Sequence, residues 1–202
     1  MFISFEGIEG SGKSTLMAAI ERALRDSGHA VISAREPGGT PLGDAVRGIF
    51  LRPGLVVDAL AETLLINASR AQLVSSVIEP ALARGTDVLC DRYVHSTLAY
   101  QGFGRGLSLE QIRGICDAAT HGVMPDLTLL VDIDLETSAR RVAARGDGAD
   151  RLEREAAAFH RRVREGFLEL ARRDPRVVLL DGLRSPEELL DYAMAAISAV
   201  MQ

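Results

Sequence analysis

The sequence contains no tryptophan, only two cysteines and few aromatic residues of any kind. The two cysteines, Cys90 and Cys116, lie far apart, so we expect buried thiols in a reducing compartment rather than a disulfide or a metal site. No run of about 18 apolar residues is present, which argues against a membrane-spanning helix. The start of the chain shows no basic segment followed by an apolar run, so no signal peptide is predicted. We therefore expect a cytoplasmic protein that does not bind membranes.

The chain also lacks an excess of basic residues. It has 23 lysines and arginines against 28 aspartates and glutamates, a formal net charge of −5. Such a balance does not favour broad attraction to nucleic acid polymers or to an anionic membrane, so any charge that binds phosphate must be local. The 202 residues, 47% of them hydrophobic, suffice for a single domain over residues 1–202.

One glycine-rich stretch carries most of the functional information. Residues 7–14 read G-I-E-G-S-G-K-S and match the phosphate-binding loop G-x-x-x-x-G-K-[ST]. In such a loop the backbone amides approach the phosphates, Lys13 supplies a point charge and Ser14 offers a hydroxyl to Mg²⁺. A turn that only links a strand to a helix is the simpler alternative, but it leaves the lysine and the hydroxyl at these spacings unexplained. Glu9 would be repelled by phosphate, so we expect it to face a sugar hydroxyl or a metal-bound water.

The hydrophobic pattern predicts an α/β fold. Five short apolar runs are typical of strands covered on both faces, at residues 2–6, 30–34, 87–91, 127–133 and 177–181. Helical patterns lie between them, the longest from about 58 to 84, and capping signals stand at Thr40-Pro41, Ser108 and Ser185. This alternation predicts a five-stranded parallel sheet with helices on both faces and ligands at the carboxyl ends of the strands.

Acids fall at or near the ends of four predicted strands, namely Glu6, Asp91, Asp132 and Asp181. An acid at a strand end downstream of a phosphate-binding loop is typical of a second anchor for the Mg²⁺ shell, and Asp91 fits that position. Arg92, the next residue, suits a fork-like grip on a phosphate. The alternatives are a cap or turn acid for Asp91 and an ordinary salt bridge for Arg92.

Two more segments are typical of ligand-binding loops. Residues 35–40 read R-E-P-G-G-T after the second strand and form either a pocket wall or a simple turn. Residues 95–102 read H-S-T-L-A-Y-Q-G and place several hydrogen-bonding side chains just after Arg92. This composition is poor for a core and suited to reading the polar edge of a ligand.

Arginines gather between residues 140 and 155, around a G-D-G sequence at 146–148. A solvated helix face is one interpretation, because acids are interleaved with the arginines. We favour a mobile lid at about 140–155 that carries arginine over the transferring phosphate and excludes water.

Taken together, these motifs resemble thymidylate kinase of the bacterial type, and the resemblance covers nearly the whole chain. It rests on residues 5–14, 35–40, 70–72 (R-A-Q), 91–93 (D-R-Y), 96–102, 125–127 (P-D-L) and 150–153 (D-R-L-E). The resemblance implies a P-loop NTPase fold, transfer of the γ-phosphoryl group of ATP to dTMP in dTTP synthesis, Mg²⁺ with ATP, and a homodimer.

The resemblance also implies roles for individual positions. The ATP-binding residues would be Gly7, Ile8, Glu9, Gly10, Ser11, Gly12, Lys13, Ser14 and Thr15, and the metal would be held by Ser14 and Asp91. The substrate-binding residues would be Glu9, Glu36, Arg47, Ile66, Arg70, Arg92, Ser96, Thr97, Tyr100 and Gln101. The catalytic residues would be Lys13, Arg92, Arg151 and, as the second choice within the lid, Arg145.

Within that set, the dTMP phosphate would be held by Arg70, Arg92 and Arg47. The base would be read by Thr97 and Gln101, with Arg70 nearby.

Three positions refine the expected site. Tyr100 would crowd out a ribose 2′-hydroxyl, and Glu9 would face the sugar of the acceptor. The glycine-rich loop lacks the arginine found there in one branch of the family, so the catalytic arginine would come from the lid. Ile66 stands where the family commonly has a phenylalanine stacking on thymine, so the base would rest on an aliphatic wall.

Two rival functions stay open. A kinase for another nucleoside monophosphate, such as dUMP, would differ only in a methyl pocket worth about 1–3 kcal/mol. A P-loop nucleotide switch that is not a kinase is the other, although the Asn-Lys-x-Asp segment of guanine-specific switches is absent. A kinase of this kind needs no general base, because the second pKa of the acceptor phosphate is about 6 and leaves it ready to attack.

Overall fold

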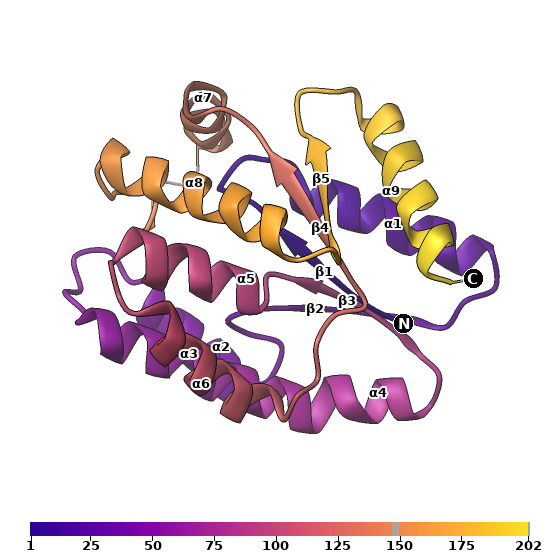
Figure 1. The fold of residues 1–202 in the computed structure, drawn as a ribbon, viewed down its shortest axis with the longest axis horizontal. Helices are drawn as coiled ribbons and strands as arrows, with labels where there is room; N and C mark the ends of the chain where they lie inside the picture. The colour runs from indigo at the N-terminus through magenta and orange to yellow at the C-terminus, as the bar shows by residue number, and fades with distance from the viewer. Residues whose placement is uncertain (147–149, 202) are drawn as a thin grey trace.

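The computed structural model describes residues 1–146 and 150–201. Five strands form one parallel sheet in the order β2-β3-β1-β4-β5 (Figure 1). Their bounds are β1 Phe2–Glu6, β2 Val31–Arg35, β3 Asp87–Asp91, β4 Leu127–Asp132 and β5 Val177–Asp181. The predicted α/β fold is confirmed, with β2 one residue later than predicted and β4 ending one residue earlier.

Helices cover both faces of the sheet, as Figure 1 shows. One face carries α1 (Lys13–Asp26) and α9 (Pro186–Val200). The other carries α2 Pro41–Phe50, α3 Ala59–Leu73, η1 Val74–Ile78, α4 Glu79–Ala83, α5 Val94–Thr97, η2 Leu98–Gly104, α6 Leu109–Thr120 and α8 Ala157–Arg173. Helix α7 (Leu135–Arg145) lies beyond the carboxyl end of β4 (Figure 1).

The capping signals place the helix ends where the sequence predicts them. The Thr40 hydroxyl accepts from the Gly43 amide, with proline in the next position, and Ser185 forms a capping box with Glu188. The long pattern from 58 to 84 begins at Asp58, whose carboxylate accepts from the first amides of α3. It continues through the π-helical turn η1 into α4.

The sheet separates two apolar cores. On one face α1 and α9 pack through Leu16, Ile20, Leu24, Leu189, Ala193 and Ile197. On the other face the core is larger and takes in Leu73, Ile78, Cys116, Val163 and Phe167. Both cysteines are buried free thiols. Among the described residues, no helix combines the length and the hydrophobicity that crossing a bilayer requires.

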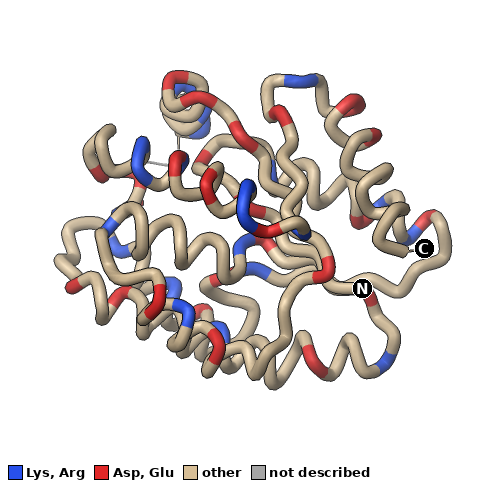
Figure 2. Tube along the Cα trace, viewed as in Figure 1, with Lys and Arg blue, Asp and Glu red and all other residues tan. Residues whose placement is uncertain are grey.

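Lysines and arginines are interspersed with aspartates and glutamates along the chain, as Figure 2 shows. This mixture of signs is in keeping with the net charge of −5. The charges that matter for a ligand therefore have to be sought where the strands end.

Candidate active site

A cavity of about 640 Å³ opens where β1, β2 and β3 end. Its size is typical of a small-molecule site. It brings together the predicted residues Glu9, Gly10, Ser11, Gly12, Lys13, Ser14, Thr15, Glu36, Arg47, Ile66, Arg70, Asp91, Arg92, Ser96, Thr97, Tyr100, Gln101 and Arg145. Of the predicted site residues, Gly7, Ile8 and Arg151 do not line it.

The glycine-rich loop has the backbone that anion binding requires. At Gly7 the φ angle is +137°, and a Cβ atom would come within 2.3 Å of the Val131 carbonyl oxygen, so only glycine fits. Helix α1 begins after Gly12 with no side-chain cap and no acid in its first turn. Its first amides, and the positive end of its dipole, are therefore free for an anion.

Lys13 folds back over this loop. Its Nζ donates to the Ile8 carbonyl at 3.1 Å and is buried. Burial, with repulsion from Arg92, lowers the pKa of Lys13 to about 8. A phosphate beside the amine would favour its charged form, so a phosphate ligand and the Lys13 charge support each other.

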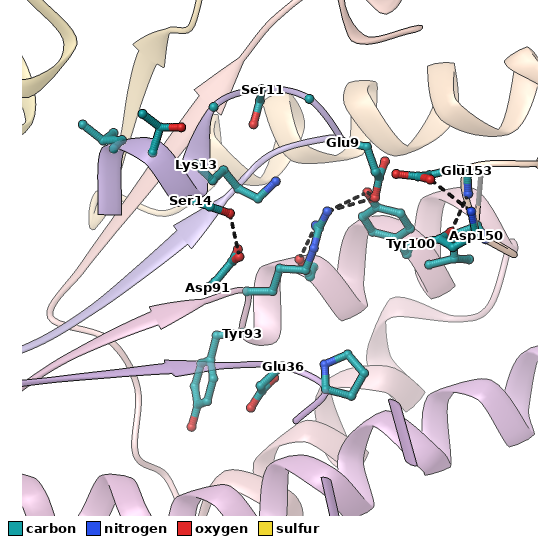
Figure 3. A pocket seen from close by; sticks show the side chains of 18 of the residues that line it. Glu9, Ser11, Lys13, Ser14, Glu36, Asp91, Tyr93, Tyr100, Asp150 and Glu153 are labelled. Carbon is teal, nitrogen blue, oxygen red and sulfur yellow. Dashed lines mark hydrogen bonds and ion pairs between the residues drawn. The ribbon is translucent and has the colours of Figure 1, made fainter. Parts of the chain in front are cut away.

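Ser14 and Asp91, the two predicted metal ligands, both line the cavity and contact each other. The Ser14 hydroxyl donates to Asp91 Oδ2 at 3.2 Å, drawn as a dashed line in Figure 3. Asp91 Oδ1 is buried and has no partner within the described part of the chain. A hydroxyl and an unpartnered carboxylate oxygen suit a hard cation such as Mg²⁺. The described residues contain no group of three histidine, cysteine or acidic side chains that could hold a metal alone, so phosphate oxygens and water would complete the shell.

Arg92 lines the cavity directly after β3. Its backbone φ of +71° lies in the left-handed region, which is uncommon for a residue other than glycine. One terminal nitrogen donates to the Gly7 carbonyl and to the Ser96 hydroxyl, both at 3.0 Å. The other donates to Glu9 at 2.9 Å and to the Tyr100 hydroxyl at 3.3 Å. Among the described residues, no partner takes the Nε–H, which is left for a ligand.

Glu9 and Tyr100 lie together on the same wall (Figure 3). The Tyr100 hydroxyl donates to Glu9 Oε1 at 2.6 Å, while Oε2 is buried without a partner in the described chain. Burial alone would raise the pKa of Glu9, but the charges of Arg92 and Lys13 hold it below its usual value. The free oxygen is therefore an acceptor for a ligand hydroxyl, in line with the sugar-facing role predicted for Glu9.

Behind Arg92 lies Glu6, which sequence reasoning noted as a strand-end acid without giving it a role. One carboxylate oxygen accepts from the Tyr93 amide at 2.8 Å, and the other accepts from the Ser96 hydroxyl at 2.5 Å. That hydroxyl also accepts from Arg92. Burial raises the pKa of Glu6 to about 7, against the opposing effects of Ser96 and Arg92. Glu6 thus holds the Tyr93 amide and, through Ser96, the side chain of Arg92 without lining the cavity.

Arg70 occupies the opposite end of the cavity and is almost wholly buried. Its five N–H groups donate to the Glu36 carboxylate, to Asn67 and Cys116, and to the Thr97 hydroxyl. The charge of Glu36 raises the pKa of Arg70, although burial opposes it. Because every donor is used within the protein, the geometry favours a role in building this wall, and the predicted grip on a phosphate stays a prediction.

Two further predicted substrate residues, Ile66 and Arg47, also line the cavity. Ile66 lies one helical turn before Arg70, with no aromatic side chain in its place. Arg47 of α2 also lines the cavity and donates to the Pro37 carbonyl at 3.1 Å. Burial, followed by repulsion from Arg35, lowers the pKa of Arg47.

Glu62 was not anticipated from the sequence, although it lies on α3 four residues before Ile66 and eight before Arg70. It is fully buried and accepts from Gln101 at 2.6 Å. It also forms ion pairs with Arg105 at 3.3 Å and with Arg151 at 2.7 Å. The spacing of Glu62, Ile66 and Arg70, four residues apart each and so on one face of α3, was the signal that could have revealed it.

Arg151, the first choice for a catalytic arginine, lies away from the phosphate-binding loop. Besides its ion pair with Glu62, its Nε donates to the Phe50 carbonyl at 2.8 Å, and its guanidinium stacks over the Phe50 ring. Its catalytic role stays a prediction.

Two other arginines of the predicted lid, Arg141 and Arg145, line the cavity. Arg145 lines the cavity and pairs with Glu153. Arg141, which the sequence did not single out as a ligand-facing residue, donates to the Gly10 and Gly182 carbonyls at 3.1 Å each. Residues 147–149 of the predicted lid, including part of its G-D-G sequence, lie outside the described residues.

His95 departs from the expectation that residues 95–102 form one polar ligand edge. It lines a separate cavity of about 370 Å³ with Arg113, Arg173 and Arg176, and lies 3.5 Å from Asp174. The helical path of α5 and η2 is the reason, since it sends Thr97, Tyr100 and Gln101 to the main cavity and His95 to another side.

Comparison with known proteins adds independent information. The family model described as thymidylate kinase matches residues 5–192. A thymidylate kinase of Deinococcus radiodurans is 52% identical over 199 residues, covering 98% of this chain and 96% of its own. One of Carboxydothermus hydrogenoformans is 50% identical over 188 residues, covering 93% and 92%. The crystal structure of thymidylate kinase from Ehrlichia chaffeensis superposes with a TM-score of 0.74 at 34% identity, covering 89% of this chain and 91% of that one.

Proposed function

The chain belongs to the thymidylate kinase family and is a nucleoside monophosphate kinase, and from that premise we propose that it transfers the γ-phosphoryl group of Mg-ATP to dTMP. The products are ADP and dTDP, on the route to dTTP. The observation that carries the proposal is that two separate phosphate-binding features share one cavity. These are the amides and lysine of the glycine-rich loop and, across from them, Arg92 with an unused Nε–H.

The main chemical difficulty is the approach of two anions, since donor and acceptor both carry phosphate. Lys13 and the first amides of α1 neutralise the donor, and Arg92 neutralises the acceptor. When bound, Mg²⁺ would be held by Ser14 and the unpartnered oxygen of Asp91, and it would supply positive charge that offsets the negative charge of the donor phosphates. No side chain is needed as a general base, because the acceptor phosphate is already largely dianionic at neutral pH.

The remaining walls suit a deoxynucleotide. The free oxygen of Glu9 can accept from a sugar hydroxyl, and the ring of Tyr100 fills the space beside it. Thr97 and Gln101 offer polar atoms to the base, while Ile66 forms an aliphatic wall. A dUMP kinase would use the same arrangement, so the preference for thymine over uracil depends on how closely this wall fits the methyl group.

We also propose that the segment at about 140–155 acts as a lid over the phosphates, with a catalytic arginine supplied by Arg151 or Arg145, and that two copies of the chain associate. Exposed apolar side chains on α2 and α3 support a homodimer, namely Leu42, Ile49, Leu60 and Leu64.

The proposal is tested by measuring ADP formation from Mg-ATP with dTMP, dUMP, UMP, dCMP, dGMP and AMP in parallel. We expect kcat/KM to be highest for dTMP and activity to depend on Mg²⁺. A higher kcat/KM for dUMP would move the function to that substrate on the same mechanism. If no monophosphate stimulates ADP formation, the kinase proposal fails and a nucleotide switch takes its place.

A further inference from the structure

Two hydrogen-bonding side chains line the base end of the cavity from the same stretch of helix. Thr97 closes α5 and Gln101 lies one turn later in η2. Both are almost completely buried, and both line the cavity. A hydroxyl and an amide can each donate or accept, so their chemistry toward a ligand depends on what holds them from behind.

Glu62 holds Gln101. Its Oε1 accepts from Gln101 Nε2 at 2.6 Å. Two guanidinium groups, of Arg105 and Arg151, balance the Glu62 charge. An ionised carboxylate only accepts hydrogen bonds, so the NH₂ group of Gln101 has to face it. The reversed amide would bring two oxygens together in a buried site, at a large electrostatic cost.

The carbonyl oxygen of Gln101 is consequently turned away from Glu62. This Oε1 atom is buried and has no partner among the described residues. A buried carbonyl oxygen without a partner is unusual and calls for one. Because Gln101 lines the cavity, a ligand that brings an N–H group to this point satisfies it.

Thr97 is held in the opposite sense by Arg70. A guanidinium only donates, so the Thr97 hydroxyl accepts from Arg70 at 3.0 Å and keeps its own proton for another partner. Arg70 is locked in turn by Glu36, at 2.6 Å and 2.9 Å. Within the described chain no acceptor takes the Thr97 proton. The cavity wall therefore presents a donor at Thr97 and an acceptor at Gln101.

We propose that two buried acids determine that Thr97 donates and Gln101 accepts, and that this wall thereby selects a pyrimidine with an imide edge. Glu62 acts directly on Gln101, and Glu36 acts on Thr97 through Arg70. Thymine and uracil offer an oxygen acceptor at position 4 beside an N3–H donor, which matches the pair. Cytosine offers an amino donor beside a bare N3 acceptor, the reverse polarity at both points. This inference rests on the proposed function, and it assigns Glu62 as a positioning residue that never touches the base.

The test compares dTMP with 5-methyl-dCMP, which carries the same methyl group and differs only along the edge in question. For the wild-type protein we expect the ratio of kcat/KM values to favour dTMP by a hundredfold or more, roughly the effect of leaving buried polar groups unpaired. In Glu62→Gln the amide of residue 62 can donate as well as accept, so Gln101 can turn over. The ratio should fall about tenfold and not vanish, since Thr97 still favours the 4-oxygen.

Two internal controls separate selectivity from general damage. The dTMP to dUMP ratio should stay within about twofold in Glu62→Gln, because the methyl group is read elsewhere. Glu155→Gln removes another carboxylate from Arg105, which lies 2.6 Å from it, and leaves Gln101 untouched. The dTMP to 5-methyl-dCMP ratio should be unchanged in that variant.

Glu62 is buried, so a second variant guards against a protein that does not fold. Gln101→Met keeps the volume of the side chain and removes the acceptor. Its kcat/KM should fall for dTMP and not for 5-methyl-dCMP. An equal loss on both substrates in either variant would overturn the proposal. A wild-type protein that phosphorylates neither would instead overturn the proposed function.

Discussion

Two arginines stand at opposite ends of the cavity, each paired with a glutamate, yet they are used differently. The Arg70–Glu36 pair is sealed, with side-chain exposures of 1% and 2%. The Arg92–Glu9 pair is partly open, at 20% and 14%. All five N–H groups of Arg70 donate to other residues, whereas the Nε–H of Arg92 has no partner among the described residues.

Arg70 is therefore a structural charge of the cavity wall, whereas Arg92 keeps a donor for a ligand. A sealed ion pair is costly to break, because removing one partner leaves the other uncompensated in a medium of low polarity. A partly open arginine loses less when its protein partner goes and gains more when a phosphate arrives. Substitution at the Arg70 end should therefore affect mainly stability, and substitution at the Arg92 end mainly turnover.

The largest effect is expected for Arg92→Ala. Loss of the phosphate-facing guanidinium should lower kcat/KM for dTMP about a thousandfold or more, roughly 4 kcal/mol of transition-state stabilisation. Steady-state kinetics with dTMP as the varied substrate provide the measurement. Arg172→Ala, at an exposed arginine paired only within its helix, is the matched control. A loss below tenfold, accompanied by a marked fall in melting temperature, would place Arg92 among the structural charges instead.

The next effect concerns stability at the sealed end. Glu36→Gln leaves Arg70 buried beside a neutral partner and should lower the free energy of unfolding by roughly 3 kcal/mol. Urea denaturation followed by circular dichroism gives this value. Glu9→Gln, at the open pair, should cost about 1 kcal/mol or less. Equal losses in the two variants would remove the distinction between the pairs.

The smallest effect concerns the acid behind Arg92. Because the pKa of Glu6 is about 7 in the folded protein and 4.5 in its unperturbed state, folding favours the protonated carboxyl. This contribution is fully present below about pH 4.5 and is lost as the pH rises through about 7. Between pH 5 and pH 8 the wild-type protein should lose about 2 kcal/mol of stability relative to Glu6→Gln. Paired urea titrations at the two pH values measure the difference, and a difference that does not change with pH would show that Arg92 keeps Glu6 ionised.

Most of the fold is predictable from the sequence, because its signals are local. Strands buried on both faces give unbroken apolar runs, and Thr40, Asp58 and Ser185 mark helix starts through contacts within three residues. The phosphate-binding loop is equally visible, since its chemistry is contiguous. Asp91 and Arg92 could also be predicted, because the topology alone brings the carboxyl ends of parallel strands to the same edge of the sheet.

The partners of these residues were not predictable, because they come from distant parts of the chain. Gln101 meets Glu62 across 39 residues, and the Tyr93 amide meets Glu6 across 87. Composition gives no sign of either contact. The contacts of Arg151 were not predictable for the same reason, since the Phe50 carbonyl that accepts from it is 101 residues away.

One carboxylate, Glu62, is shared between Gln101, which lines the cavity, and Arg151, which belongs to the proposed lid. Any movement that carried Arg151 away would leave that charge less balanced and change its hold on Gln101. Thermodynamic linkage then requires reciprocity. If a ligand bound at Gln101 shifts the equilibrium between two positions of Arg151, the affinity for that ligand differs between those two positions by the same factor. Under the proposed function, Glu62 would therefore couple the affinity of the cavity for the base to the position of Arg151.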